Sequence, residues 1–314
     1  MVSSLAPLLD TLTKRFPGIP AEHSDAPDLH LFHAPNSICS QKVRAVLAER
    51  GIDYSSHLLN IFAGDTYDPD YVRVRMVGCR SADLRLADRH LGTTSVASSG
   101  CDACVVPTLI DAATGAVLVD SRAICVGLDT RAASGPSLIP DQLRTPIFAE
   151  MAIIDELPNY QSLAVKVVPA TVPRNTFAAS KVARCDALLA KHQGDPDLRA
   201  AYQAKRDKEQ FAAEKLFDDA ALMAARQAIV DALAGLEVRL SEASGRFLFG
   251  DTLTMADLFW GCELLRIDEM GDASMWQDNR LPLVEAYLAR LSDVPSLRTA
   301  IIGFPGARMA PAGH

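Results

Sequence analysis

The pattern of apolar and polar side chains becomes regular at residue 28. Residues 29–33, Leu-His-Leu-Phe-His, alternate in the way a half-buried β-strand does. Residues 38–50 then place apolar side chains at helical spacing, namely Val43, Val46 and Leu47. Gly51 ends this predicted helix, because glycine suits the position that follows a helix. A second strand near 54–59 would complete a strand–helix–strand unit.

Residues 61–104 follow no regular pattern. Residues 68–72 predict the start of a short helix, and the stretch 92–100, rich in Ser, Thr and Gly, predicts a loop. Such a long irregular segment is uncommon inside a compact domain. It indicates a lid or an insertion, which we place at about 75–104.

Pro107 lies within the next apolar stretch, 105–110. Proline blocks a hydrogen bond of the sheet, and therefore marks an edge strand, a bulge or a cis turn. A cis bond here would turn the backbone of Val106 outward, where it can pair with an extended peptide. A strand over 117–119 follows, and Asp120-Ser121 would cap a helix that runs to about residue 131.

The character of the chain changes again after residue 132. Residues 133–143, which include Gly, Pro and Ser, predict a linker, and the pattern beyond them is helical. Thr145 and Pro146 predict the first helix start. Further along, one helix face is formed by Leu222, Ile229, Leu233, Leu236 and Leu240. Thr254 and Asp257 have the spacing of a capping box, which predicts another helix start.

Length and composition agree with two folded domains. The chain has 314 residues, of which 49% are apolar and 22% charged. We expect a partly ordered tail over 1–27, a first domain over 28–132, the linker, and a second domain over 144–314. The net charge of −8 argues against broad contact with nucleic acid. The sequence contains no run of eighteen apolar residues, so it predicts no membrane-spanning helix. The N-terminus lacks the features of a secretory signal.

Seven cysteines are scattered along the chain, an odd number that does not fit a secreted disulfide framework. We therefore expect a reduced, cytoplasmic protein. Cys101-x-x-Cys104 has the spacing of a zinc or redox motif, and Cys79 with His90 would complete four ligands. The motif lies in a predicted loop, and no second Cys-x-x-Cys follows it. We expect solvated or partly buried thiols there, and no bound metal.

Cys39 lies near the start of the first predicted helix. Free backbone N–H groups and the positive end of the helix dipole stabilise a thiolate there, and so lower the pKa of a cysteine. The alternative is that Cys39 is a small buried apolar residue. Ser37 is either a plain helix cap or a hydrogen-bond donor to an incoming thiolate. Lys42 and Arg44 either form a solvated face or attract an anion to this site.

Four motifs, taken together and in this order, resemble the glutathione transferase superfamily. They are Ser37-Ile38-Cys39-Ser40, Val105-Val106-Pro107-Thr108-Leu109, Asp120-Ser121, and the capping segment Gly250–Asp257. The resemblance covers residues 28 to about 302. It implies a thioredoxin-like α/β N-terminal domain with a cis proline before its third strand, an all-α C-terminal domain, and a homodimer.

The same resemblance implies a glutathione site. Backbone groups of Val106, beside Pro107, would pair with the cysteinyl unit of glutathione. Asp120 would hold the ammonium of the γ-glutamyl unit, and the Ser121 amide, at a helix N-terminus, would hold its carboxylate. Ser37 would stabilise the glutathione thiolate.

A narrower resemblance is to the bacterial hydroquinone reductive dehalogenases, of the tetrachloro- and especially the 2,5-dichlorohydroquinone type. It rests on the long insertion before Val105 and on four segments, Leu31–His33, Ser37–Arg44, Pro69–Arg73 and Asp257–Trp260. Most glutathione transferases have Tyr or Ser but no Cys at this turn. Ser37 together with Cys39 is therefore the pair that distinguishes the two groups.

This narrower resemblance implies a two-stage reaction on a small aromatic substrate. Glutathione thiolate displaces halide from the ring, and Cys39 then attacks the glutathione sulfur, which releases the hydroquinone and leaves a mixed disulfide. His33, Asp155 and Tyr160 are candidate pocket residues. One alternative is a transferase that conjugates, or cleaves aryl ethers or thioethers, and needs no Cys39. The other is a non-catalytic glutathione-binding protein.

Overall fold

A mixed sheet of five strands, in the order β1-β3-β2-β4-β5, organises the N-terminal half of the computed structural model, which describes residues 5–19, 28–132 and 135–308. The strands are β1 (Gly18–Ile19), β2 (Leu29–His33), β3 (Ser55–Leu58), β4 (Thr108–Asp111) and β5 (Ala116–Leu118). β2 and β3 run parallel, because a helix connects them, and the other neighbours are antiparallel. This arrangement confirms the predicted thioredoxin-like domain.

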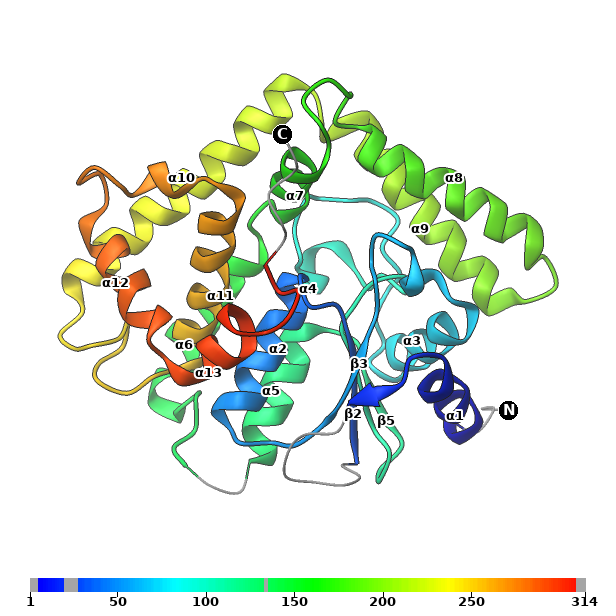
Figure 1. The fold of residues 1–314 in the computed structure, drawn as a ribbon, viewed down its shortest axis with the longest axis horizontal. Helices are drawn as coiled ribbons and strands as arrows, with labels where there is room; N and C mark the ends of the chain where they lie inside the picture. Colours follow the sequence, from blue (N-terminus) through cyan, green and yellow to red (C-terminus); the bar gives the residue numbers. More distant parts are fainter. Residues whose placement is uncertain (1–4, 20–27, 133–134, 309–314) are drawn as a thin grey trace.

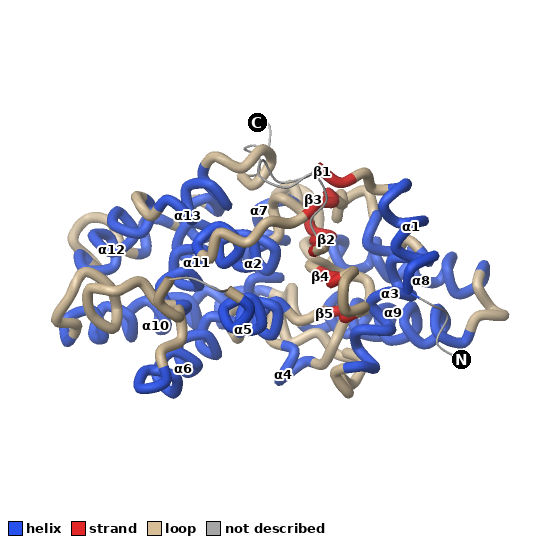
Figure 2. The backbone as a smooth tube through the Cα atoms, turned by 90° about the horizontal axis from the view of Figure 1, so that it is seen from below, coloured by secondary structure: helices blue, strands red, loops and turns tan. Residues whose placement is uncertain are grey.

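Helices cover both faces of the sheet, as Figures 1 and 2 show. α2 (Ile38–Glu49) and α5 (Ser121–Arg131) pack on one face together with Leu29 and Leu31. α3 (Pro69–Ser81) packs on the other face, and Phe32 belongs to that second core. Successive side chains of a strand point to opposite faces. β2 is therefore buried on both faces, whereas its alternating sequence predicted a half-buried strand.

The C-terminal half is all-α, as predicted. Its helices are α6 (Arg144–Asp155), α7 (Asn159–Val167), α8 (Thr176–Lys191), α9 (Pro196–Lys215), α10 (Asp219–Glu242), α11 (Met255–Met270), α12 (Pro282–Ser292) and α13 (Pro295–Leu297). α10 buries four of the five residues predicted to share its face. The capping box of Thr254 and Asp257 begins α11, as predicted. α6 begins at Arg144 with Leu143 as its cap, so the prediction of Thr145 as the cap is wrong by two residues.

The pair of helices α8 and α9 lies over the first domain, beside α3 (Figure 1). Leu198 and Tyr202 of α9 share an apolar cluster with Val72 and Met76 of α3. The Tyr202 hydroxyl donates a hydrogen bond to the carbonyl of Tyr67 at 2.8 Å. These contacts hold α9 of the second domain against α3, on the face of the sheet opposite α2 and α5.

Residues 5–19 of the N-terminal segment are structured, while the expectation of a partly ordered tail over 1–27 stays a prediction. α1 (Leu5–Arg15) buries Leu12 completely, in the same core as Phe32. β1 pairs with β3, and the His57 ring donates to the carbonyl of Phe16 at 2.6 Å. Residues 1–4 and 20–27 of the expected tail lie outside the described residues.

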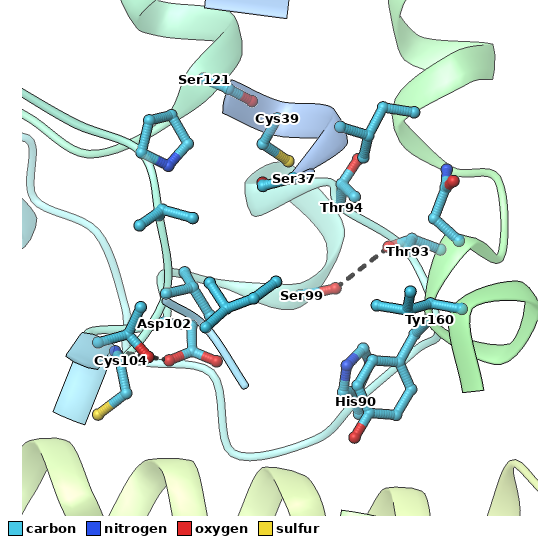
Figure 3. A pocket seen from close by; sticks show the side chains of 18 of the residues that line it. Ser37, Cys39, His90, Thr93, Thr94, Ser99, Asp102, Cys104, Ser121 and Tyr160 are labelled. Carbon is cyan, nitrogen blue, oxygen red and sulfur yellow. Dashed lines mark hydrogen bonds between the residues drawn. The ribbon is translucent and has the colours of Figure 1, made fainter. Parts of the chain in front are cut away.

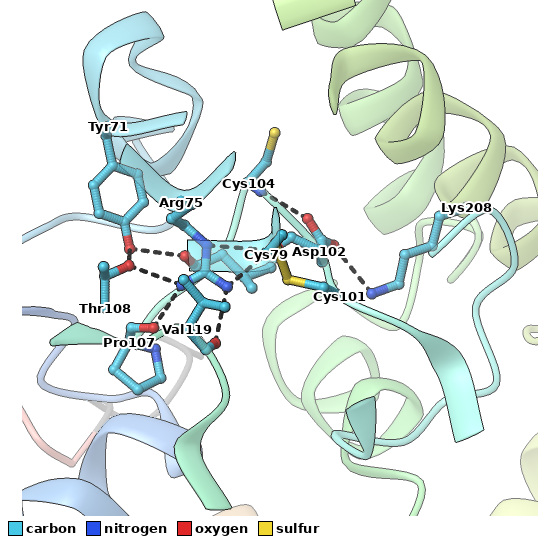
Figure 4. Close-up of a disulfide and its surroundings, with 11 residues drawn as sticks. Tyr71, Arg75, Cys79, Cys101, Asp102, Cys104, Pro107, Thr108, Val119 and Lys208 are labelled. Atoms are coloured by element: carbon cyan, nitrogen blue, oxygen red, sulfur yellow. Dashed lines mark hydrogen bonds and ion pairs between the residues drawn. A yellow bond between two sulfur atoms is a disulfide. The ribbon is translucent and has the colours of Figure 1, made fainter. Parts of the chain in front are cut away.

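The segment 61–104 contains more structure than its pattern predicted. α3 is 13 residues long rather than a short helix, and the four-residue α4 (Val96–Ser99) lies within the predicted loop. A helix as short as α4 shows no periodic pattern of apolar residues. The pattern of α3 is obscured because polar side chains are among its buried residues. A disulfide joins Cys79 of α3 to Cys101 (Figure 4), so the expectation of free thiols is wrong for this pair. Cys104 is a free thiol and is buried.

Arg75 of α3 fastens the end of this segment. Its buried guanidinium donates to the carbonyls of Asp102, Pro107 and Val119, at 2.8, 2.5 and 3.2 Å, and to the Thr108 hydroxyl at 2.8 Å (Figure 4). Buried carbonyls need a donor. One side chain therefore holds together the stretches of backbone on either side of Val106.

None of the described helices combines the length and the apolar character that a membrane span requires. In the described part of the chain, no three His, Cys, Asp or Glu side chains gather in the way metal ligands do. The expected absence of a metal and the domain boundaries stay predictions. The linker prediction, 133–143, falls partly on residues outside the described ranges.

Candidate active site

A cavity of about 250 Å³ lies between the two domains. Figure 3 shows Ser37 and Cys39 on one side of this space, with Tyr160 and His90 on the other. The cavity is lined by seven of the predicted site residues, namely Ser37, Cys39, Val106, Pro107, Asp120, Ser121 and Tyr160. His33 and Asp155 were also predicted to lie in the pocket, but neither lines it.

The start of α2 presents Ser37 and Cys39 to the cavity. Ser37 is the N-cap residue, and its hydroxyl accepts a hydrogen bond from the Ser40 amide at 3.4 Å. Cys39 is the second residue of the helix, half-buried, and has a hydrogen bond with the Ser121 side chain. The capping role of Ser37 leaves its O–H proton free to donate, because the cap uses only the acceptor side of the hydroxyl.

The pKa of Cys39 is raised, which corrects the expectation of an activated thiolate. Burial is the main cause, and Asp155 adds to it. The nearby Lys42 ammonium and the hydrogen bond with Ser121 act in the opposite direction. The helix start thus orients the sulfur, while desolvation keeps it protonated at neutral pH.

We expect Cys39 to react with iodoacetamide more slowly at neutral pH than a free cysteine does. Because its pKa is raised, the thiolate fraction is smaller, and the rate should keep rising at alkaline pH beyond the inflection of a free thiol. Mass spectrometry of the alkylated peptide, with N-acetylcysteine as reference, measures both rates. An inflection below that of the reference would contradict this result.

Lys42 and Asp155 form a buried ion pair behind Cys39. Their atoms Nζ and Oδ1 are 2.7 Å apart, and both side chains are almost fully buried. Burial opposes the charge on Lys42, but Asp155 and Cys39 together raise its pKa above the usual value. The expectation that Lys42 belongs to a solvated face is therefore wrong. Asp155 does not line the cavity, but it acts on the site by pairing with Lys42 and by its charge, which raises the pKa of Cys39.

His33 and Arg44 are also buried away from the cavity. His33 Nδ1 lies 3.1 Å from the Arg44 guanidinium, and its Nε2 lies 2.8 Å from the Ser56 hydroxyl. Burial, then the charge of Arg44, holds the pKa of His33 well below its usual value, so the ring is neutral. Arg44 donates to the carbonyls of Pro35 and Ala300, each at 2.8 Å. These residues fix the turn before α2 instead of contacting a ligand.

Two predicted features lie on the adjacent wall. The Val106–Pro107 peptide is cis, and the Tyr71 hydroxyl donates to the neighbouring Val105 carbonyl at 2.8 Å. Asp120 caps α5 by accepting from the backbone of Arg122 at 3.2 Å. Ser121 is the first residue of that helix, so its backbone N–H is free for an anion.

The wall opposite Cys39 was not foreseen, apart from Tyr160. It includes His90 and three lysines, Lys181, Lys205 and Lys208, which come from the insertion and from α8 and α9. The backbone of Thr94 and of Gly92 bonds to Asp155 and Tyr160, at 3.0 Å each, and this docks the insertion beside α7. In the sequence, the spacing of the α9 lysines is that of a solvated helix face, so no local pattern marks them as cavity residues.

Residues 36–131 match the family model of the glutathione S-transferase N-terminal domain, and residues 178–290 match that of the C-terminal domain. A 2,5-dichlorohydroquinone reductive dechlorinase of Sphingobium indicum is 35% identical over 292 residues, which cover 89% of this chain and 84% of the relative. The chain belongs to the glutathione S-transferase family. The resemblance seen in its motifs is thereby confirmed.

One further relative and one solved structure are similar to this glutathione S-transferase. The tetrachloro-p-hydroquinone reductive dehalogenase of Sphingobium chlorophenolicum is 26% identical, over 87% of this chain and 96% of the relative. The solved β-etherase LigF from Sphingobium sp. strain SYK-6 has a TM-score of 0.59 and 16% identity, over 87% of this chain and 98% of its own. The last comparison shows that the two proteins share a fold.

Proposed function

We propose that this glutathione S-transferase removes chloride reductively from chlorinated hydroquinones, at the expense of two molecules of glutathione. The observation that carries the proposal is the pair Ser37 and Cys39, which share one cavity beside the backbone of Val106. A serine alone supports thiol conjugation, whereas a cysteine in the same cavity adds thiol–disulfide exchange. The identity of 35% to a dichlorohydroquinone dechlorinase supports the choice of substrate.

Glutathione would lie along the wall formed by Val106, Asp120 and Ser121. The extended peptide pairs with the Val106 backbone, and its α-carboxylate meets the free N–H at the start of α5. Burial raises the pKa of Asp120, with hydrogen bonds from Arg122 and Ala123 acting against it. An ammonium bound beside this carboxylate would favour its charged form. This position brings the glutathione sulfur to Ser37 and Cys39.

The reaction balances with two thiols as the reductant. In the first stage the glutathione thiolate forms a C–S bond to the ring, and the C–Cl bond breaks with release of chloride. In the second stage Cys39 sulfur bonds to glutathione sulfur, the C–S bond breaks, and the ring carbon takes a proton. A second glutathione then attacks the mixed disulfide, so that two glutathiones are oxidised to their disulfide and Cys39 is restored.

The chain's own residues have separate tasks in this scheme. Ser37 donates a hydrogen bond to the glutathione thiolate of the first stage. Cys39 remains protonated during that stage, because burial raises its pKa, and so does not compete as a nucleophile. Lys42 stabilises the Cys39 thiolate when its proton leaves. The two sulfur nucleophiles are thus used in sequence.

The test is mass spectrometry of the intact protein after incubation with glutathione and 2,5-dichlorohydroquinone, with chloride assayed in parallel. We expect one glutathione adduct, mapped to Cys39, together with released chloride. A protein that binds glutathione but gives neither adduct nor chloride would contradict dehalogenation, and would favour conjugation or ether cleavage. We further propose a cytoplasmic homodimer, and light scattering after gel filtration would measure its mass.

A further inference from the structure

The cavity wall that faces Cys39 holds more positive than negative charge. Lys181, Lys205 and Lys208 line it, together with Asp102, and Glu209 is buried directly behind them. Lys205 and Lys208 lie 2.7 and 3.0 Å from the same Asp102 oxygen. Lys205 also lies 2.7 Å from Glu209. The two carboxylates, of Asp102 and Glu209, therefore balance the charge of only two of the three ammonium groups.

Lys181 is the member of this cluster that lies furthest from a carboxylate. Its Nζ is 3.8 Å from Glu209, which Lys205 holds more tightly. Burial and the other lysines lower the pKa of Lys181 to about 8, although Glu209 opposes them, so the side chain is still mainly protonated at pH 7. The nearby carboxylates are ionised, because the lysines hold the pKa of Asp102 well below its usual value and that of Glu209 at about 2.

The remaining groups around the cluster bring no compensating charge. Burial keeps the pKa of His90 well below its usual value, and it raises the pKa of Tyr67 and Tyr160. Burial likewise raises the pKa of Cys104 and Cys185. All five are therefore neutral at pH 7. The cluster has a net charge of about +1, and desolvated charge of this kind is costly unless an anion joins it.

Aromatic rings surround the Lys181 ammonium. It lies 3.8 Å from the centre of the Phe177 ring and 4.4 Å from that of Tyr160. Of its three protons, one is donated to the Tyr160 hydroxyl at 3.0 Å, and that hydroxyl in turn donates to Glu209. The other two protons are available to a ligand in the cavity. The site therefore combines a cation with surfaces that suit a flat ring.

We propose that Lys181 binds an ionised ring hydroxyl of the aromatic substrate, with the ring held beside Tyr160 and Phe177. This inference rests on the proposed function for the identity of the substrate. Ring chlorines withdraw electrons and make a hydroquinone more acidic, so that it presents a phenolate oxygen near neutral pH. Because Lys181 contacts Tyr160, which lies across the cavity from Cys39 (Figure 3), the ring would reach from the ammonium toward the glutathione sulfur. Lys181 would thus select phenols over rings that lack an ionisable hydroxyl.

The probe for this subsite is 4-nitrophenol, whose ionised form absorbs visible light. We expect its pKa to fall by about 1 to 3 units when it binds to the protein, since an opposite charge within a few ångströms produces shifts of that size. The Lys181→Met variant should lose this shift, and Lys181→Arg, which keeps the charge, should retain it. Lys191→Met, at the exposed end of the same helix, is the matched control and should behave as the wild type does.

Three results would overturn the proposal. They are no binding of 4-nitrophenol to the wild type, an unchanged pKa of the bound probe, and a full shift in Lys181→Met. Thermal unfolding shows whether each variant is folded, and 2,5-dichlorohydroquinone should displace the probe from the wild type. Because the assay needs neither glutathione nor turnover, it separates this subsite from the dehalogenation test. If the wild type shifts the pKa of the probe but releases no chloride, the proposal for Lys181 stands and the proposed dehalogenation is contradicted.

Discussion

The Cys39→Ser variant should release chloride from 2,5-dichlorohydroquinone and accumulate the aryl–glutathione thioether, with chlorohydroquinone formation reduced to background. The first stage uses the glutathione sulfur and Ser37, both of which the variant retains. The second stage needs a sulfur that can form and release a disulfide, and a serine oxygen cannot. Because Cys39 is half-buried at the helix start, the smaller hydroxyl fits the same position.

Liquid chromatography with mass detection measures the thioether and the chlorohydroquinone in one sample. Cys125→Ala is the matched control, since Cys125 is a free, buried thiol of α5 that does not line the cavity. The Cys125→Ala variant should form chlorohydroquinone as the wild type does. Formation of chlorohydroquinone by Cys39→Ser at the wild-type rate would contradict the mixed-disulfide stage.

The Arg75→Met variant should lose about 3 to 5 kcal/mol of unfolding free energy. The substitution keeps the volume of the side chain but removes every donor from three buried carbonyls and the Thr108 hydroxyl. Each unpaired buried acceptor costs about 1 to 3 kcal/mol. Urea unfolding followed by fluorescence measures the loss. The glutathione site should also weaken, because Arg75 holds the carbonyl of Pro107.

Arg80→Met provides the control on the same helix. Arg80 is exposed and pairs with Asp197 at 2.9 Å on the surface. Exposed ion pairs of this kind contribute little, so the change should stay within about 0.5 kcal/mol. Equal stability of the two variants would show that the buried hydrogen bonds of Arg75 are replaced by water or by local rearrangement.

The sequence was sufficient for the parts of the site that depend on local geometry. A serine cap followed by a cysteine, a proline at the start of a strand, and an Asp-Ser cap each specify a short piece of backbone. The structure places Ser37, Cys39, Pro107 and Ser121 in one cavity. Their convergence follows from the strand–helix–strand order, which hydrophobic periodicity also predicts.

The charged residues were harder to place, for a physical reason. Lys42 has its partner Asp155 on another domain, and Lys205 has its partner Asp102 in the insertion, more than a hundred residues away. The sequence of a helix does not distinguish a solvent-exposed lysine from one that is buried and paired with a distant carboxylate. Only the docking of α8 and α9 against α3 turns their polar residues inward. The raised pKa of Cys39 has the same origin, since desolvation comes from the tertiary fold.

The disulfide was missed because the fold, and not the spacing, decides the pairing. Cys101-x-x-Cys104 attracted attention as a local motif, yet Cys101 pairs with Cys79 of α3. The helix that carries Cys79 was predicted to be short. Because the length of α3 was underestimated, the sequence did not indicate that its last turn lies beside Cys101.

The N-terminal segment has a consequence for how the protein can be shortened. Residue 28 is the natural place to begin the first domain if the sequence alone is considered. A chain begun there would lose β1, and β3 would become an open sheet edge that other chains can pair with. It would also uncover the apolar surface that Leu12 covers. We expect the truncated protein to self-associate. The first strand therefore protects solubility as well as completing the sheet.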